Sequence, residues 1–370
     1  MSIQEAKSQD DLQKTLLYVG TYSVRGSEGI YVYNFDDETG AFSLLQTVGG
    51  VVSPSFIELH PNGKFLYSVN RGGVIPNKKW GSISAFTINP SSGELYALNK
   101  QTSNGEGPCH VAVDPDGDYV YVGNYVSGNL VMYPIKDDGS IRVSSDMVQH
   151  EGSGANEKRQ EGPHVHSVNP SPDGKFIYVP DLGINKIKTY APNKVDGKLG
   201  EAKSEAVAAS GAGPRHFTIH PSGKFAYSAE ELTSTVGVFA VDEEKGKLTS
   251  IQENVSSLPA DFKGESYSAD IHVHPNGKFL YVSNRGHNSV AIFKIAEETG
   301  KLELLKTESV LGNWPRNFMV TPNGKFLLCA NERSDNIVIY TINQETGMLS
   351  PLDKQIKMPS PVCLKMLHLE

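Results

Sequence analysis

Two histidines in the segment GPHVHS could carry acid–base chemistry. His164 and His166 are separated by one residue, so an extended strand would place both side chains on the same face. Such a pair can move protons, or it can simply hydrogen-bond to the backbone. A zinc site would need a third ligand, for which His216 and His287 are candidates. The acid–base and structural interpretations both stay open at this point, and we expect no bound metal.

An arginine and a glutamate form a second candidate pair, in GPRHF and AEELT. Arg215 directly follows a proline, and Glu231 comes sixteen residues later. If the two segments are neighbouring antiparallel strands, the two side chains meet at the same end of that strand pair. Arg215 could then tune Glu231 as a general base, or the two charges could only neutralise each other.

Further arginines occur at similar positions. Arg285 in NRGHNS is expected to hold an anionic group of a substrate, with His287 beside it in the same loop. Arg71 lies in a similar NRG segment, and Arg316 follows a proline in WPRNF. We expect Arg71, His164, His216, His287 and Arg316 to contribute to substrate binding, although a solvent-exposed loop would also explain the NRGHNS residues.

The composition argues against several classes of protein. The 370 residues include 34 Lys and Arg against 42 Asp and Glu, a net charge of −8, with no segment rich in basic residues. Nucleic acid and anionic membranes are therefore poor candidate partners. Three scattered cysteines favour neither disulfides nor a zinc site. The polar first residues lack the apolar stretch of a secretion signal, and no apolar run is long enough to span a bilayer. We expect a soluble, cytoplasmic protein.

A repeated phrase indicates the elements that position these residues. HPNGKFLYSVN, from His60, returns in five further variants such as HPSGKFAYSAE and HPNGKFLYVSN. The glycines of the phrase are 47 to 57 residues apart: Gly63, Gly117, Gly174, Gly223, Gly277 and Gly324. Each period contains four short runs rich in β-branched and aromatic residues, separated by turn residues. A period of this length with four strands is typical of propeller blades.

The two chain ends complete the pattern. Residues 15–46 supply three strands of a further repeat, and the terminal segment SPVCLKMLHL supplies the missing innermost strand. We therefore predict an all-β, seven-bladed propeller of four-stranded antiparallel blades, closed by pairing of the C-terminal strand with the N-terminal blade. Residues 1–14 are predicted to form a flexible tail, and residues 15–370 a single domain.

Strand direction then predicts which face carries the site. The innermost strands begin, and the second strands end, on one face of the disc. That face also carries the irregular connections 71–80, 151–162 and 253–266. The candidate residues lie at these strand ends, around the mouth of the central channel. Several cations with a carboxylate at a channel mouth suit a small anionic molecule that is bound and chemically altered.

The same segments resemble those of a known family. GPHVH, GPRHF followed by EELTSTV, NRGHNSV, and WPRNF followed by ANERSDNI are similar to the signatures of seven-bladed lactonases, over residues 15–368. That family contains propeller-type 6-phosphogluconolactonases and 3-carboxy-cis,cis-muconate lactonizing enzymes. The resemblance implies catalytic roles for His166, Arg215, Glu231 and Arg285, with His164 as the close alternative to His166.

The resemblance also implies a reaction. We expect metal-independent and cofactor-free hydrolysis of a sugar lactone, with 6-phosphogluconolactone of the pentose phosphate pathway as first candidate. Either Glu231 or His166 would activate water. A muconate-type cycloisomerase and a non-catalytic binding propeller are the alternatives. The sequence departs from the family pattern at Glu230 and at Glu332–Arg333, which adds carboxylates near the predicted site.

Overall fold

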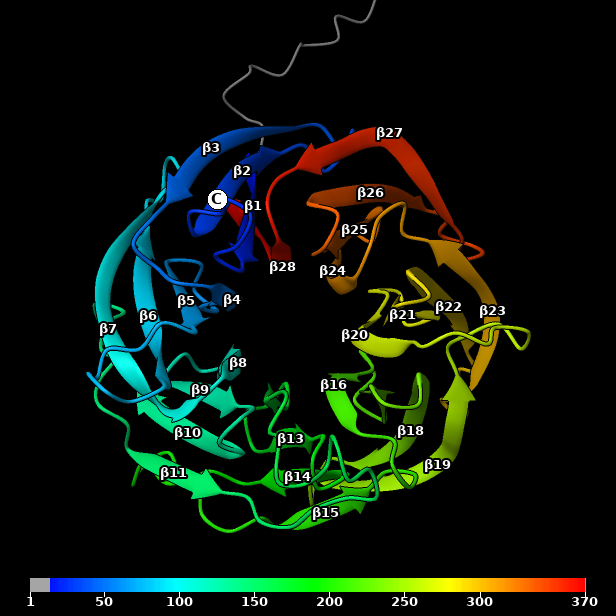
Figure 1. Ribbon diagram of the computed structural model, residues 1–370, viewed down its shortest axis with the longest axis horizontal. Coiled ribbons are helices and arrows are strands. Elements are labelled where there is room, and N and C mark those ends of the chain that lie inside the picture. The colour runs from blue at the N-terminus through cyan, green and yellow to red at the C-terminus, as the bar shows by residue number, and fades with distance from the viewer. Residues whose placement is uncertain (1–13, 370) are drawn as a thin grey trace, which may run out of the picture.

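The computed structural model describes residues 14–369 as seven four-stranded antiparallel sheets in a ring (Figure 1). The first blade contains β28 (Pro361–Leu369), β1 (Lys14–Thr21), β2 (Ile30–Phe35) and β3 (Phe42–Val48). The second contains β4 (Pro54–Leu59), β5 (Phe65–Asn70), β6 (Trp80–Ile88) and β7 (Leu95–Glu106). The third contains β8 (Pro108–Val113), β9 (Tyr119–Asn124), β10 (Asn129–Pro134) and β11 (Asp146–Gln149).

The other four blades repeat this order, with the first-named strand innermost (Figure 1). The fourth contains β12 (Asn169–Pro170), β13 (Ile177–Asp181), β14 (Lys186–Tyr190) and β15 (Ser204–Val207). The fifth contains β16 (Pro214–Ile219), β17 (Phe225–Glu230), β18 (Thr235–Asp242) and β19 (Lys247–Ser256). The sixth contains β20 (Tyr267–Val273), β21 (Phe279–Arg285), β22 (Ser289–Ile295) and β23 (Leu302–Ser309). The seventh contains β24 (Pro315–Val320), β25 (Phe326–Asn331), β26 (Asn336–Ile342) and β27 (Leu349–Lys357).

The predicted seven-bladed fold and its closure are confirmed. β28 pairs antiparallel with β1, from Lys14 opposite Leu369 to Gly20 opposite Cys363. The core continues across the seam, because Leu364 of β28 packs in one apolar cluster with Leu328 of the seventh blade. No helix within residues 14–369 is long and apolar enough to cross a membrane. The division into a tail of residues 1–14 and one domain stays a prediction, since residues 1–13 lie outside the described part.

The repeated phrase joins each blade to the next. In three blades its histidine accepts a hydrogen bond at Nδ1 from the backbone N–H two residues later, which leaves the proton on Nε2. Nε2 then donates to the carbonyl of the phrase glycine in the following blade. These contacts are His60 to Gly117 at 3.0 Å, His220 to Gly277 at 2.8 Å and His274 to Gly324 at 3.0 Å. The histidines of the repeated phrase are therefore structural.

The tyrosine of the phrase makes a second connection between blades. Its hydroxyl is buried and donates to the carbonyl of a glycine in the outer turn of the next blade, which satisfies a polar group that would be costly to bury alone. These pairs are Tyr18 with Gly93, Tyr67 with Gly139, Tyr227 with Gly300 and Tyr281 with Gly347, all at 2.9–3.0 Å. The sequence repeat thus encodes contacts between blades as well as strands within them.

The fourth blade departs from the expected pattern. The repeat predicts a full inner strand in this blade as in the others, but the structure has a single bridge between Val165 and Asp181 and then the two-residue strand β12. The neighbouring strand β13 contains Pro180, which has no N–H to donate to a ladder. The Asp181 carboxylate accepts from the His164 N–H instead, at 2.7 Å. The His164–His166 segment is therefore held by this contact together with two backbone hydrogen bonds, from the His166 N–H to the Pro180 carbonyl and from the Leu182 N–H to the His164 carbonyl, both at 3.0 Å.

Deleting residues 360–370 is expected to give insoluble or unfolded protein. The deletion removes β28 and with it the buried Leu364 and Met366. Truncating one such core side chain costs about 2–5 kcal/mol, and whole domains are stable by only about 5–15 kcal/mol. Soluble yield and melting temperature are the measurements. Leu44→Ala, at an exposed position of β3, is the control and should change the melting temperature little. A truncated protein that melts at the parent temperature would contradict closure by β28.

Candidate active site

The carboxylate of Glu231 lies among three arginines. Glu231 follows the end of β17, and its side chain is buried. Its Oε1 is 2.6 Å from Nη2 of Arg159, and its Oε2 is 2.7 Å from Nη2 of Arg285 and 3.1 Å from Nε of Arg215. Nε2 of His166 is 3.9 Å from the same Oε2. The structure therefore brings the predicted His166, Arg215, Glu231 and Arg285 into one cluster.

A recurring β-bulge positions Arg215 in this cluster and Arg316 at its mouth. In β16 the register shifts between Pro214 and His216, so Arg215 has no partner in the ladder with β17. The same shift occurs in β24 around Arg316. A bulge adds one residue to a strand and redirects its side chain. The leading proline that the sequence repeats thus marks the bulge, and the residue after it differs from blade to blade.

The arginines hold Glu231 in its ionised form. Burial alone would raise the pKa of Glu231, but Arg285, Arg215 and Arg159 hold it far below the usual range. Burial, together with the charges of Arg285 and Arg316, lowers the pKa of Arg215 to about 9, which leaves it charged at neutral pH. A carboxylate so strongly stabilised as an anion is a poor proton acceptor. Glu231 is better suited to hold the arginines in place.

His166, unlike the ionised Glu231, carries no charge at neutral pH. Burial, followed by the positive charge of Arg215, lowers the pKa of His166 well below its ordinary value. Its Nδ1 is 3.9 Å from Sγ of Cys109, whose thiol stays protonated because burial raises its pKa to about 11. At neutral pH His166 is therefore an uncharged imidazole within a cationic cluster, and an anionic ligand that offsets the charge of Arg215 would make it a better proton acceptor.

The structure separates the two histidines of GPHVHS. The ring of His164 stacks on Tyr125, with centroids 4.4 Å apart and planes 7° apart. Its Nδ1 is 2.9 Å from the Tyr125 carbonyl, and its Nε2 is 3.2 Å from Oε1 of Glu161. His164 thus lies at the rim, whereas His166 faces Glu231.

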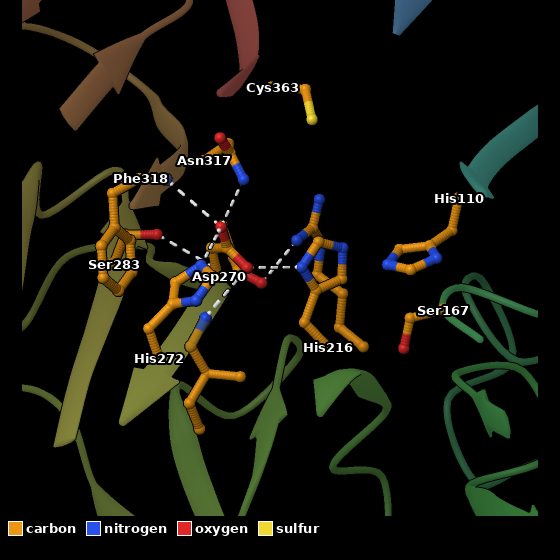
Figure 2. A network of polar contacts seen from close by, with 12 residues as sticks. His110, Ser167, His216, Asp270, His272, Ser283, Asn317, Phe318 and Cys363 are labelled. Carbon is orange, nitrogen blue, oxygen red and sulfur yellow. Dashed lines mark hydrogen bonds and ion pairs between the residues drawn. The ribbon is translucent and has the colours of Figure 1, made fainter. Parts of the chain in front are cut away.

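His216 was expected to bind substrate, but the structure places it in a different network. Its Nδ1 is 2.6 Å from Oδ1 of the buried Asp270, and Nε2 of His272 is 3.0 Å from the other carboxylate oxygen. Figure 2 shows His216 and His272 directed at Asp270 from different sides, with Asn317 nearby. Both His216 and Asp270 line a cavity of about 340 Å³ that extends toward the turn-phrase face. His216 therefore lies closer to the face with the turns of the repeated phrase than the cluster of Glu231 and its arginines does.

The remaining predicted substrate-binding residues lie in two places, one away from the cluster and one at its mouth. His287 packs edge-on against Phe262, with ring centroids 4.7 Å apart, and does not reach Glu231 within residues 14–369. Arg71 and Arg316 do lie at the cluster's mouth, where both guanidinium groups contact the ring of Tyr22. Across the part of the chain that the structure describes, no group of three or more His, Cys, Asp or Glu side chains could hold a metal ion.

Comparison with known proteins agrees with this architecture. Residues 16–366 match the family model described as lactonase, 7-bladed beta-propeller. The chain belongs to this family. It is 38% identical over 357 residues to a 6-phosphogluconolactonase of Bacillus subtilis, covering 96% of this chain and 99% of that protein. A 6-phosphogluconolactonase of Formosa agariphila is 35% identical over 310 residues, covering 82% of this chain and 86% of that protein.

A solved structure gives the same result at the level of the fold. The periplasmic gluconolactonase of Pseudomonas aeruginosa superposes with a TM-score of 0.90 and 31% identity, covering 96% of this chain and all of that one. The family resemblance expected from the signature segments is therefore confirmed. The roles of individual residues within this family member remain predictions.

Arg159 is the cluster member that the sequence did not reveal. It lies in the connection 151–162, which was singled out as irregular, but that segment also contains Glu157, Lys158 and Glu161. Nothing in the local pattern distinguishes the one charge that turns inward. The structure selects Arg159 because its guanidinium reaches Glu231 and also donates to the Tyr125 hydroxyl at 3.3 Å. This contact spans 72 residues of sequence.

Replacing Arg159 and replacing Arg215 are expected to lower the stability of the folded protein by different amounts. The Arg159 side chain is 36% exposed, so Arg159→Gln should cost about 0–1 kcal/mol, as for other partly solvated pairs. The Arg215 side chain is 2% exposed, so Arg215→Gln removes a deeply buried partner of Glu231, which keeps Arg285, and should cost about 1–3 kcal/mol. Denaturant unfolding of the two variants beside the parent is the measurement. Equal losses would show that burial does not set the strength of these pairs.

Proposed function

We propose that this protein hydrolyses a sugar lactone, with 6-phosphoglucono-1,5-lactone as the first candidate. The observation that carries the proposal is the neutral His166 beside the ionised Glu231 and its arginines, at one mouth of a propeller of the lactonase family. The names of the Bacillus and Formosa relatives support the phosphorylated substrate. A lactone is an activated ester, so a proton acceptor and a stabilised oxyanion suffice for its hydrolysis.

In the proposed reaction His166 is the base. Nε2 takes a proton from water as the water oxygen attacks the lactone carbonyl carbon. The carbonyl oxygen becomes an oxyanion next to Arg215 and Arg285. When the intermediate collapses, the bond from the carbonyl carbon to the ring oxygen breaks, and the ring oxygen takes the proton from the His166 imidazolium. The products are a carboxylic acid, which ionises, and a free hydroxyl group.

Two arginines supply the electrostatic stabilisation in this scheme. The Nε–H group of Arg285 is buried and has no hydrogen-bond acceptor within residues 14–369, whereas Nε of Arg215 lies 3.1 Å from Oε2 of Glu231. Donors that are already desolvated and fixed stabilise a developing negative charge without reorganisation. Glu231 fixes both guanidinium groups and stabilises the His166 cation that forms during the reaction, at 3.9 Å. Between the two bases that the sequence allowed, the proposal therefore assigns the role to His166.

An activity screen tests the proposed function. Purified protein should hydrolyse 6-phosphogluconolactone faster than the spontaneous rate, which is measured in parallel without enzyme. A panel of neutral sugar lactones and a muconate would identify another substrate class, including the cycloisomerase alternative. Activity should survive exhaustive chelation, as expected for a metal-independent enzyme. Turnover of no lactone in the panel would contradict the proposal and favour a binding propeller.

The pH dependence tests the role of His166. Because the pKa of His166 lies well below its usual value of about 6.5, the base form should persist to lower pH than for an ordinary histidine. We expect kcat/KM to be flat near pH 7 and to fall only as the pH drops through that depressed pKa. His166→Gln should lower kcat by about 10²- to 10⁴-fold, whereas His164→Gln should preserve the pH profile. A limb centred at or above pH 6.5 would contradict this assignment.

A further inference from the structure

Two arginines at the channel mouth lie against one tyrosine ring. Tyr22 follows β1, Arg71 follows β5, and Arg316 occupies the bulge at the start of β24. The guanidinium carbon of Arg71 is 4.9 Å from the centroid of the Tyr22 ring, and that of Arg316 is 5.4 Å from the same centroid. Tyr22 belongs to the first blade, Arg71 to the second and Arg316 to the seventh, and these three blades are consecutive in the ring (Figure 1). They therefore form one sector of the mouth.

The two arginines differ from the three that surround Glu231. Arg159, Arg215 and Arg285 each form an ion pair with its carboxylate. Arg316 is partly buried, yet across residues 14–369 its guanidinium has neither a hydrogen bond nor an ion pair. Arg71 contacts the Tyr22 hydroxyl at 3.3 Å and has no ion pair in the same part of the chain. Each guanidinium group carries five N–H donors, so this sector presents unused donors and two uncompensated positive charges.

The neighbouring groups stabilise the charge of Arg316, and this charge acts on the residues of the reacting centre. Burial opposes the charged form of Arg316, but Tyr22, Glu332 and Glu231 together raise its pKa. Glu332 acts from a distance, since no ion pair joins it to Arg316 in the described chain. The charge of Arg316 in turn contributes to lowering the pKa of His166, Arg215 and Arg285. The sector therefore lies within electrostatic reach of the residues proposed to act on the lactone.

We propose that Arg316 and Arg71, arranged on Tyr22, form the subsite for the phosphate group of a phosphorylated sugar lactone. This inference rests on the proposed lactone hydrolysis and adds to it the residues that bind the anionic group of the substrate. Arg285 was expected to hold the anionic group, but its guanidinium is engaged by Glu231 at 2.7 Å and by the Ser268 carbonyl at 3.1 Å. The two uncompensated charges match a phosphate dianion, whose three oxygens can accept from both planar guanidinium groups.

The subsite predicts a difference between two substrates. Arg316→Ala should raise KM for 6-phosphogluconolactone by about 10- to 100-fold, the range expected when a hydrogen bond to a charged group is lost. KM for neutral gluconolactone should change by less than about 3-fold, because it makes no charge-assisted bond there. Arg316→Lys should restore part of the binding, since an ammonium lacks the planar fork of a guanidinium. Arg71→Ala, at an exposed position where folding is not at risk, should show the same selectivity with a smaller effect.

The control is another arginine at the same mouth. Arg333 is exposed and lies over the Trp314 ring, with its guanidinium carbon 3.4 Å from the ring centroid. Arg333→Ala removes one positive charge nearby without touching Tyr22, so it should leave the ratio of the two KM values close to that of the parent. An equal loss of selectivity in Arg333→Ala would mean that net charge at the mouth, and not this subsite, selects the phosphate.

A binding measurement separates this inference from the proposed reaction. By calorimetry the parent protein should bind 6-phosphogluconate more tightly than gluconate, and Arg316→Ala should remove that difference. If the parent turns over no lactone but shows this difference, the reaction is wrong and the anion subsite stands. If lactones are hydrolysed but Arg316→Ala and Arg71→Ala weaken the phosphorylated and neutral ligands equally, or neither ligand, the subsite is wrong and the reaction stands.

Discussion

The pairing of β28 with β1 is the constraint on which the arrangement of the whole molecule depends. It joins the last strand of the chain to the first across nearly the full sequence, from Lys14 opposite Leu369. A ring of sheets without this pairing would expose an inner edge and the apolar side chains behind it. Closure fixes the positions of all seven inner strands around one axis. The site residues come from separate blades, so their spacing follows from the same closure.

Within that ring, contacts that recur from blade to blade join neighbouring blades. The site is formed by contacts that differ from blade to blade. The phrase histidine and tyrosine bond to glycine carbonyls of the next blade, as in His60 with Gly117 and Tyr67 with Gly139. These contacts lie on the turn side of the sheets. At the opposite face, the inner strands β4, β8, β16 and β24 each have an unpaired, bulged residue after their leading proline. Because that position has no ladder partner, its side chain can vary without breaking the sheet, and in β16 and β24 it is an arginine.

The balance of charge at this face connects structure with chemistry. Glu231 alone contacts Arg159, Arg215 and Arg285, so the cluster keeps a net positive charge even before Arg71 and Arg316 are considered. Buried cations in such number are costly unless an anion joins them. Burial, and after it the charge of Arg215, lowers the pKa of His166 and keeps it neutral. An anionic substrate would relieve both effects at once, since its charge would offset the arginines and raise the proton affinity of His166. In the proposed reaction, substrate binding would therefore increase the basicity of His166.

The sequence by itself determined the fold and most of the residue types in the site. A period of about fifty residues, with four strand-like runs in each, predicts propeller blades, and the incomplete first repeat predicts closure by the last strand. Strand direction placed Arg215, Glu231 and Arg285 at one mouth, because alternating strands send equivalent ends to the same face. Only the tertiary structure decided which charges meet. It turned Arg159 inward from a loop of mixed charges, placed His166 and not His164 toward Glu231, and moved His216 into the Asp270 network. Those outcomes depend on bulges and on contacts between blades, which join residues far apart in the chain and leave no periodic signal in it.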